Sequence, residues 1–455
     1  MTSPAKTVPS ESPPPAQLDR WPSRDTHDGP ARDAPWVYRA IARWSTVVVR
    51  RYYRVEIRGE AFPASGPVLL VQNHSNGLVD AHYPLLATLR TIRILVKYKL
   101  MRTFFIGWML RAMDAVPMYR QKDGVDTRKN ATSFAEVDRA LQGGSVITVF
   151  PEGESLDSIG LRPMKSGVAR MAMSAEASSD EPLGLTIVPI GVTYSDRDRL
   201  RSLASAVIGA PIEVGPILES AGGNLRESIV QTMARVREAL EGLILHADDE
   251  EEHRAAIALE RILPRDDTPI GLRRRDALAA LRADDPAEAR RRREVVVALG
   301  ERLAAADLSG DDVLGPTPGI GAALGPALWA GPLSLVALVV WGLPCTLGRV
   351  LARFRKTPDK VVTLRILITF AALLVWVPLI VAVAGWTWGW TGALVVAAAC
   401  IASIATFAPM LDALSSAMRA ARLRTLSSAR DSHSDLRDAI RSIRQAFGSG
   451  RGETP

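Results

Sequence analysis

One short segment carries an imidazole and a carboxylate in a spacing that suits acid–base chemistry. In Val71-Gln-Asn-His74-Ser-Asn-Gly-Leu-Val-Asp80 the two groups lie six positions apart. On one continuous helix they would point to different faces, so they meet only if the chain turns between them. Ser75-Asn76-Gly77 are residues typical of such a turn. A carboxylate on one ring nitrogen fixes the tautomer and leaves the other nitrogen as a base. The alternative is a helix start capped by Asn76, with His74 incidental.

A second segment, Val149-Phe-Pro-Glu152-Gly153-Glu154-Ser155, places a carboxylate, a glycine and a hydroxyl directly after an apolar run. Gly153 permits a close backbone approach to a ligand and can direct N–H groups at an anion. The alternative is an ordinary exit from a strand into a loop.

Two further segments carry cations that suit a phosphate. Arg162-Pro-Met-Lys165-Ser-Gly-Val-Ala-Arg170 puts basic groups at the start of an expected helix. Val116-Pro-Met-Tyr-Arg120-Gln-Lys122-Asp123 puts two cations after an expected strand. Solvated surface charges are the alternative for both. A fourth segment, Ile187-Val-Pro189-Ile-Gly191-Val, favours packing over chemistry.

Alternating short strands and helices over residues 53–215 must position these segments. The pattern predicts an α/β fold with a mixed sheet and flanking helices. The expected strands are Tyr53–Arg58, Val68–Val71, Ile92–Val96, Ala115–Met118, Val146–Phe150, Thr186–Thr193 and Val207–Val214. The expected helices are 78–90, 103–113, 129–142 and 165–177. Within the second of these, the apolar stretch Thr103–Leu110 is a candidate wall for a fatty chain, with core packing as the alternative.

The ends of this domain have distinct compositions. Residues 1–35 hold 8 of the 30 prolines and predict a disordered leader without the apolar core of a signal peptide. Residues 36–53 predict an amphipathic helix carrying Trp36 and Trp44 beside several arginines. This helix either covers the domain core or lies in a membrane interface. Residues 216–312 predict a helical extension, and residues 412–455 a polar, Arg-rich tail.

The distribution of charged and apolar residues indicates a membrane protein with an anionic partner. The net charge is +7, and residues 36–129 alone carry 16 basic and 6 acidic residues, which favours an anionic partner. Two charge-free runs, 314–348 and 366–411, predict a membrane region over 313–411, because a spanning helix needs about 20 apolar residues. The only cysteines, Cys345 and Cys400, lie in these runs, which excludes a disulfide scaffold and a cysteine-rich metal site.

The order of the four segments is more specific than any one of them. Asn-His…Asp, Val-Pro-x-x-Arg, Phe-Pro-Glu-Gly and Val-Pro-Ile-Gly together resemble the four-block pattern of the glycerolipid acyltransferase family over roughly residues 40–215. That family includes glycerol-3-phosphate, dihydroxyacetone-phosphate and lysophosphatidate acyltransferases. Pro-Met-Lys165-Ser-Gly-Val-Ala-Arg170 also looks like the Pro-Leu-Lys-Thr-Gly-Ala-Ala-Arg stretch of one bacterial branch, which tends to carry C-terminal apolar segments.

The resemblance implies an O-acyltransferase of phospholipid synthesis. A fatty acyl group would move from acyl-CoA or acyl carrier protein, a co-substrate, to a phosphorylated glycerol-type acceptor, with no cofactor and no metal. His74 would be the general base and Asp80 its orienting carboxylate. The positions that would bind the acceptor or shape its site are Arg120, Glu152, Gly153, Ser155, Lys165 and Arg170.

Two departures from the family pattern bear on the acceptor. The spacing here is His-x5-Asp instead of the common His-x4-Asp, which favours glycerol 3-phosphate or dihydroxyacetone phosphate, with lysophosphatidate as the alternative. The usual Arg after Phe-Pro-Glu-Gly is replaced by Glu154-Ser155-Leu156. The phosphate must then be held by other cations, for which Arg120, Lys165 and Arg170 are the candidates.

Two other classes of protein compete with this interpretation. A metallohydrolase would use His74, Asp80 and His82 as ligands. A membrane scaffold with a degenerate acyltransferase domain would lack the intact His74, Asp80 and Glu152 that this chain has. Nucleic-acid binding is a poor fit, because the basic excess lies beside phosphate-ester motifs and membrane runs. No pattern in the chain fixes an oligomeric state.

The basic segment 349–365 predicts how the chain crosses the cell membrane. Basic loops stay in the cytosol, as should the tail after residue 412 and an acyltransferase domain that needs cytosolic thioesters. These constraints hold together if 314–348 is re-entrant or interfacial, broken at Gly331-Pro332 and Gly342-Leu-Pro344, while residues 366–384 and 389–411 span the membrane.

Overall fold

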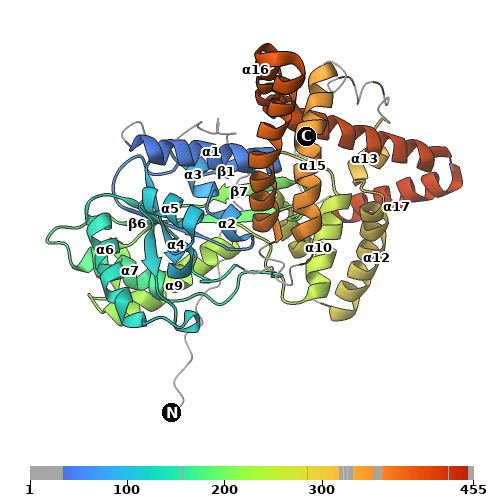
Figure 1. Ribbon diagram of the computed structural model, residues 1–455. Helices are drawn as coiled ribbons and strands as arrows, with labels where there is room; N and C mark the ends of the chain where they lie inside the picture. The colour runs from blue at the N-terminus through green and yellow to red at the C-terminus, as the bar shows by residue number, and fades with distance from the viewer. Residues whose placement is uncertain are drawn as a thin grey trace.

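The computed structural model describes residues 34–155, 158–283, 285–316, 321, 325, 331–352, 354, 361–428 and 430–448. The expected leader therefore lies outside the described residues, except for Ala34 and Pro35. An α/β domain, a group of shorter helices and a long helical hairpin lie side by side (Figure 1).

A mixed eight-stranded sheet forms the centre of the α/β domain, as predicted. Its order is β1-β7-β6-β2-β5-β3-β4, with β8 paired to β6. The strands from β6 to β4 in this order run parallel, whereas β7 and β8 pair antiparallel with β6. The strand bounds are β1 Arg54–Gly59, β2 Val68–Gln72, β3 Ile92–Lys97, β4 Val116–Met118, β5 Val146–Val149, β6 Thr186–Tyr194, β7 Leu203–Ile208 and β8 Ile212–Glu213.

Helices cover both faces of this sheet. In β2, Val68 and Leu70 pack on one side with α1, α3 and α5, while Leu69 and Val71 pack on the other with α6, α7 and α9. Burial on both faces explains why β2 is apolar throughout. The helices of the domain are α1 Trp36–Tyr52, α2 Gly77–Asp80, α3 Tyr83–Ala87, α4 Tyr98–Met101, α5 Phe104–Ala112, α6 Asn130–Gln142, α7 Gly167–Ala177, α8 Gly215–Ser220 and α9 Leu225–Glu241.

Helix α1 covers the core, as the first of its two interpretations expects. Its buried face consists of Tyr38, Ile41, Ala42, Ser45 and Val49. The Tyr38 hydroxyl donates to Ile92 O (3.2 Å) and accepts from Ile92 N (2.9 Å), which fixes the helix to β3. Trp36 and Val47 remain exposed on the opposite side.

Two expected elements are divided by prolines. The helix expected over 78–90 is two short helices, α2 and α3, and Pro84 at the start of α3 has no N–H to continue the first. The strand expected over Val207–Val214 is instead the end of β7 and the short β8, separated by Gly209-Ala210-Pro211.

A second core lies among the shorter helices that follow. They are α10 Glu250–Ile262, α11 Ile270–Leu281, α12 Pro286–Ala305, α13 Gly310–Leu314 and, from the C-terminus, α17 Arg430–Gly448. Leu423, near the end of α16, joins the same cluster. The division of the chain at residues 216, 313 and 412 stays a prediction.

Two long apolar helices, α15 Gly331–Ala352 and α16 Val361–Ser428, are each long and apolar enough to cross a membrane. Gly389, with φ of 71°, is non-helical and divides α16 into the two arms of a hairpin. Figure 1 shows α15 and α16 standing together beside the α/β domain, with α1 lying crosswise to them and meeting them partway along their length.

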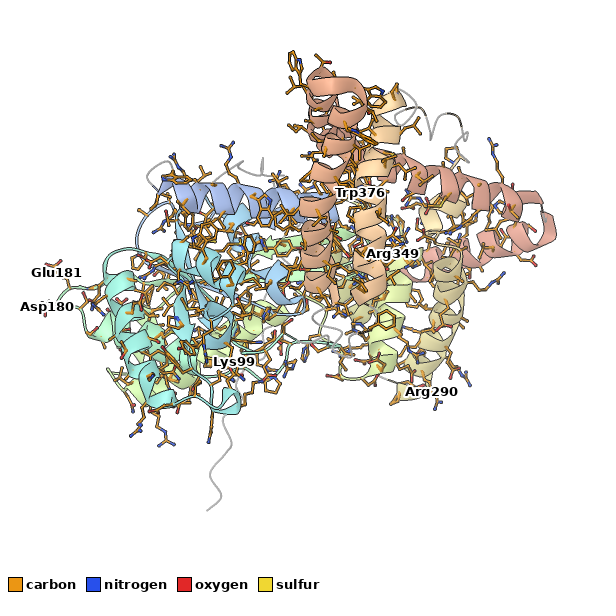
Figure 2. The ribbon with its side chains drawn as sticks, in the orientation of Figure 1. Lys99, Asp180, Glu181, Arg290, Arg349 and Trp376 are labelled. Carbon is orange, nitrogen blue, oxygen red and sulfur yellow. The ribbon has the colours of Figure 1, made fainter. Side chains whose placement is uncertain are left out.

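The prediction that Gly342-Leu-Pro344 breaks the first apolar run is wrong. Helix α15 continues through Pro344 to Ala352. Pro344 cannot donate to Val340 O, but neighbouring helices support this stretch, as they do for prolines inside membrane helices. The Trp376 indole donates to Val339 O (3.1 Å) and the Thr369 hydroxyl to Pro344 O (3.4 Å). Figure 2 shows Trp376 and Arg349 at successive levels of this bundle.

Candidate active site

The predicted segments meet at one edge of the sheet. Strand β2 lies between β5 and β6 and is parallel to both, so the residues after these strands emerge side by side. This edge is where α/β sheets place their reactive groups.

The turn after β2 brings His74 and Asp80 together. His74 Nδ1 lies 2.9 Å from Asp80 Oδ2. Gly77, with φ of 47°, begins α2 directly after the turn, and this places Asp80 beside the imidazole despite the six-residue offset. The Asp80 carboxylate is buried, whereas 12% of the His74 side chain is exposed. The arrangement fixes Nδ1 and leaves Nε2 as the nitrogen for a substrate proton.

The segment after β5 holds this turn in place. Glu152 Oε1 accepts from His74 N (2.9 Å), and Ser155 Oγ accepts from Gly77 N (2.6 Å). The Phe150 ring stacks on the imidazole with centroids 4.1 Å apart. Glu152 and Ser155, predicted as acceptor-binding or site-shaping residues, therefore support the backbone on both sides of the reactive turn.

Glu152 also has an unusual ionisation. Its burial raises the pKa of the carboxyl to about 7, against the lowering effects of the His74 N–H and of Arg162. Near neutral pH this carboxyl exchanges between a neutral and an anionic form.

Asp80 has further partners that the sequence analysis missed. The Tyr194 hydroxyl donates to Asp80 Oδ1 (2.6 Å), and Asn76 N donates to Oδ2 (2.7 Å). Both oxygens of the buried carboxylate are therefore engaged. Tyr194 is the last residue of β6, the strand beside β2. The fourth segment, interpreted as packing, ends two residues before this tyrosine. The one sequence signal for Tyr194 was its position at the end of a strand expected in the same sheet as the strand before His74.

The hairpin also touches the reactive turn. Leu78 N donates to Thr363 Oγ1 (3.3 Å), in the first turn of α16. Val362 is buried in the same core cluster as α1 and α3. The sequence analysis did not connect these segments, which lie 285 positions apart.

Arg120 and Lys165 lie against the turn at Gly153. Arg120 Nη1 donates to Gly153 O (3.0 Å) and its Nε to Asp123 Oδ2 (2.9 Å). A Cβ at Gly153 would lie 2.8 Å from Lys165 Nζ, and φ at Gly153 is 71°. The backbone conformation favours glycine here, and a larger residue would also displace the end of the Lys165 side chain.

Further cations enlarge this group. The pKa of Lys122 is lowered by desolvation and by the positive charges of Arg120, Lys165 and Arg162, while Lys122 also pairs with Glu154. Arg162, which the sequence analysis did not select as a site residue, donates to Glu154 O (3.4 Å). We call Arg120, Lys122, Arg162 and Lys165 the cation cluster. Arg170 is exposed on α7, and among the described residues no contact joins it to this cluster.

A metal site is not assembled by these groups. His82 Nδ1 contacts Val79 O (3.0 Å) instead of joining His74 and Asp80. Within the described residues no three His, Cys, Asp or Glu side chains come together as metal ligands.

Residues 54–193, which contain His74, Asp80, Glu152 and the cation cluster, match the family model of acyltransferases. This segment is an acyltransferase domain. The resemblance noted in the sequence is thereby confirmed. The mixed sheet with its flanking helices confirms the predicted α/β fold class.

Curated relatives match part of the acyltransferase domain. Glycerol-3-phosphate O-acyltransferase 2 of Saccharomyces cerevisiae is 33% identical over 121 residues, which are 26% of this chain and 16% of the relative. Glycerol-3-phosphate O-acyltransferase 1 of the same yeast is 29% identical over 121 residues, with the same coverage. An uncharacterized acyltransferase of Schizosaccharomyces pombe is 40% identical over 82 residues, 18% of this chain and 12% of the relative. The matches thus span less than a fifth of each relative.

A solved structure is also similar. The 1-acyl-sn-glycerophosphate (LPA) acyltransferase PlsC of Thermotoga maritima shares 18% identity at a TM-score of 0.34, and the match covers 45% of this chain and 80% of that one.

Proposed function

We propose that this protein is an O-acyltransferase that moves a fatty acyl group from an acyl thioester to a hydroxyl of a phosphorylated glycerol-type acceptor. The observation that carries the proposal is the His74–Asp80 pair, 2.9 Å apart and next to the cation cluster. The pair supplies a base for a hydroxyl, and the cluster supplies charge for a phosphate.

His74 Nε2 takes the proton from the acceptor hydroxyl as the oxygen attacks the thioester carbonyl. Asp80, on Nδ1, stabilises the imidazolium that forms. When the carbon–sulfur bond breaks, the imidazolium returns the proton to the leaving thiolate. The acceptor gains the acyl group, and the donor leaves as a free thiol, so no covalent acyl-enzyme is needed.

Arg120, Arg162 and Lys165 are the groups we assign to the acceptor phosphate. Asp123 and Gly153 O hold the Arg120 guanidinium, which lowers the rotamer entropy lost on binding. These cations replace the arginine that the family usually carries after Phe-Pro-Glu-Gly. Arg170, on the exposed face of α7, has no such part in the proposal.

Glycerol 3-phosphate or dihydroxyacetone phosphate is the acceptor we favour. The His-x5-Asp spacing supports this choice, and so do the two budding-yeast relatives, which are named as glycerol-3-phosphate O-acyltransferases. Lysophosphatidate is the second candidate. The donor is acyl-CoA or acyl carrier protein.

We further propose that the hairpin anchors the protein in the cell membrane, with the acyltransferase domain on the cytosolic face. The length and apolar character of α15 and α16 support anchoring. Thioester donors are cytosolic, which supports the orientation.

Acylation of a panel of acceptors tests the proposed function. Membranes containing the full chain are given labelled acyl-CoA or acyl carrier protein with glycerol, glycerol 3-phosphate, dihydroxyacetone phosphate or lysophosphatidate. We expect glycerol 3-phosphate or dihydroxyacetone phosphate to be acylated and glycerol not. Acylation of lysophosphatidate alone would favour the second candidate, and no acylation of any acceptor would overturn the proposal.

Lys165→Ala with Arg170→Ala as its control tests the phosphate site. Lys165→Ala should raise the KM for the acceptor by about tenfold or more, since a charge-assisted contact contributes about 1.5–3 kcal/mol. Arg170→Ala should leave that KM unchanged. A larger effect from Arg170→Ala would contradict the assignment.

A further inference from the structure

Helix α5 exposes large aromatic side chains. Phe104 is 95% exposed, Trp108 51% and Phe105 42%. The helix is attached to the core through Gly107 and Leu110, which are buried. The stretch considered above as a wall for a fatty chain thus turns its largest rings outward, where they lose contact with the core.

The apolar hairpin meets this surface at Phe370. The Phe370 ring lies 4.9 Å from the Trp44 ring of α1 and 6.1 Å from the Phe105 ring of α5. Phe370 is only five residues past Arg365, the last charge before the apolar run, so it lies about 7 Å along the helix from that charge. Helices α1 and α5 therefore flank α16 at the level where its apolar run begins.

The orientation of α1 agrees with a boundary at this level. Figure 1 shows α1 lying crosswise to α15 and α16 and meeting them partway along their length. If the hairpin crosses a bilayer, α1 lies along the bilayer surface, and its exposed Trp36 and Val47 are on the side away from the core. Tryptophan with flanking arginine is typical of such interfacial helices.

Arginines border the aromatic side chains of α5. A hollow of about 560 Å³ is lined by Arg102, Thr103, Phe104, Phe105, Trp108 and Arg111. A second hollow of about 390 Å³ shares both arginines and includes Tyr98 and Pro117. The Tyr98 ring lies 4.7 Å from the ring of Tyr119, the residue before Arg120. Cations beside exposed apolar rings match a phospholipid, whose anionic headgroup adjoins apolar chains.

We propose that α5, together with α1, is a second membrane-contacting surface, on which Phe104, Phe105 and Trp108 enter the interface of an anionic phospholipid bilayer and Arg102 and Arg111 contact the headgroups. The proposal rests on the hairpin crossing the membrane, as proposed above. It places the hollow beside α5 at the lipid boundary, on the side of the domain that leads through Tyr98 and Tyr119 to Arg120.

Site-directed fluorescence tests this surface. The full chain, with Cys345→Ala and Cys400→Ala, receives a single cysteine by Phe104→Cys and is labelled with an environment-sensitive fluorophore. Glu181→Cys is the matched control, because Glu181 is exposed on the outer edge of the acyltransferase domain, away from the hairpin (Figure 2). Both proteins are reconstituted into vesicles that contain nitroxide-labelled phosphatidylglycerol.

The nitroxide should quench the label at position 104 at least about twofold more than the label at 181, as expected for a group in the lipid interface. Equal quenching at both positions would overturn the proposal. A label at 104 that is shielded from aqueous quenchers but untouched by the lipid nitroxide would also overturn it, because a protein would then cover the surface.

The proposed contacts of Arg102 and Arg111 with lipid headgroups are tested in the same vesicles. Quenching at 104 should be stronger with nitroxide on phosphatidylglycerol than on phosphatidylcholine, and Arg102→Gln should reduce that difference. No preference for the anionic lipid in the parent protein would overturn the assignment of the arginines. Quenching measures membrane contact and does not require acyl transfer. A protein without acyltransferase activity could still show the expected quenching, and an active protein could lack it, so the two proposals are tested independently.

Discussion

The Asp80 carboxylate is the best-connected side chain of the reactive turn. His74 and Asn76 N occupy Oδ2, while the Tyr194 hydroxyl donates to Oδ1. Burial raises the pKa of Tyr194 well above its usual value, so this hydroxyl stays protonated and can donate. Tyr194 therefore holds the carboxylate in the orientation that presents Oδ2 to the imidazole, which makes it a positioning residue.

Tyr194→Phe should lower kcat by about tenfold, the loss expected for one hydrogen bond to a charged group, with little change in acceptor KM. Without this donor the Asp80 carboxylate can rotate away from the orientation that presents Oδ2 to the imidazole. The loss should therefore fall on kcat and not on acceptor binding. Tyr38→Phe is the control, because it also removes a buried tyrosine hydroxyl, which bonds the backbone of Ile92 and not the reactive turn. Equal losses of kcat in both variants would show that Tyr194 only packs.

Glu152 should give the acceptor a pH dependence of its own. Its pKa of about 7 means that the carboxyl is neutral below pH 7 and anionic above it. The anion adds a negative charge near Arg162 and the acceptor phosphate, so acceptor affinity should fall by about tenfold between pH 6 and pH 8. Glu152→Gln should remove this ionisation from the profile of kcat/KM for the acceptor.

Glu154→Gln is the control for that profile. Glu154 pairs with Lys122 at the surface, so its removal should leave the ionisation near pH 7 in place. A Glu152→Gln profile that still bends at the same pH would assign the ionisation to another group.

At the scale of elements, the loop between β6 and β7 joins the acyltransferase domain to the hairpin. Arg201, held at a φ of 65°, donates to Arg50 O (2.9 Å) and Tyr53 O (3.2 Å). The same guanidinium pairs with Asp412 of α16 at 2.6 Å. One side chain thus connects the end of α1, the start of β1 and the second arm of the hairpin.

Arg201→Ala should lower the Tm of the full chain in detergent by about 4–10 °C, because several charge-assisted hydrogen bonds are lost together. Alanine and arginine bear the same backbone strain at this φ, so the change reports the side-chain contacts. Arg199→Ala is the control. Arg199 pairs with Asp307 on the surface and should shift the Tm by less than about 2 °C. Equal shifts would show that the Asp412 connection does not stabilise the assembly.

The sequence predicted those elements whose signal is local. Apolar strands followed by Gly, Ser and Asn located β2 and β5 and the turns after them. The second charge-free run located two spans joined near Gly385–Gly389, and the bend lies at Gly389. Errors arose where a distant segment decided the outcome. Helix α15 continues through Pro344 where α16 packs against it, with Trp376 and Thr369 donating to Val339 O and Pro344 O. The contacts of Tyr194 and Thr363 with the reactive turn likewise depend on strand order and docking, which no local pattern contains.

At the scale of the whole molecule, the hairpin has its base at the acyltransferase domain and its bend far from it. Thr363, Arg365 and Asp412 all contact the domain, so both arms of α16 begin and end on the same side. The bend carries Trp386, Trp388 and Trp390, which are exposed. This arrangement agrees with a hairpin that crosses the membrane and returns.

Cysteine labelling tests that topology. After replacement of Cys345 and Cys400, single cysteines at positions 387 and 425 are exposed to an impermeant thiol reagent outside intact cells. Only position 387, beside the bend at Gly389, should react. Position 356, in the basic segment outside the described residues, should stay unlabelled as well. Labelling at 425 would place the tail outside, and labelling at 356 would require three simple spans.

The measurement that tests the central claim most directly is the acylation of glycerol 3-phosphate and dihydroxyacetone phosphate by the parent chain and by His74→Ala, in equal amounts in membranes. The parent should transfer the acyl group and release one thiol per ester formed. His74→Ala should remain folded in the membrane and lose at least about 100-fold in rate, the contribution of a positioned base. A variant that keeps more than about a tenth of the parental rate would contradict the assignment of His74 as the base.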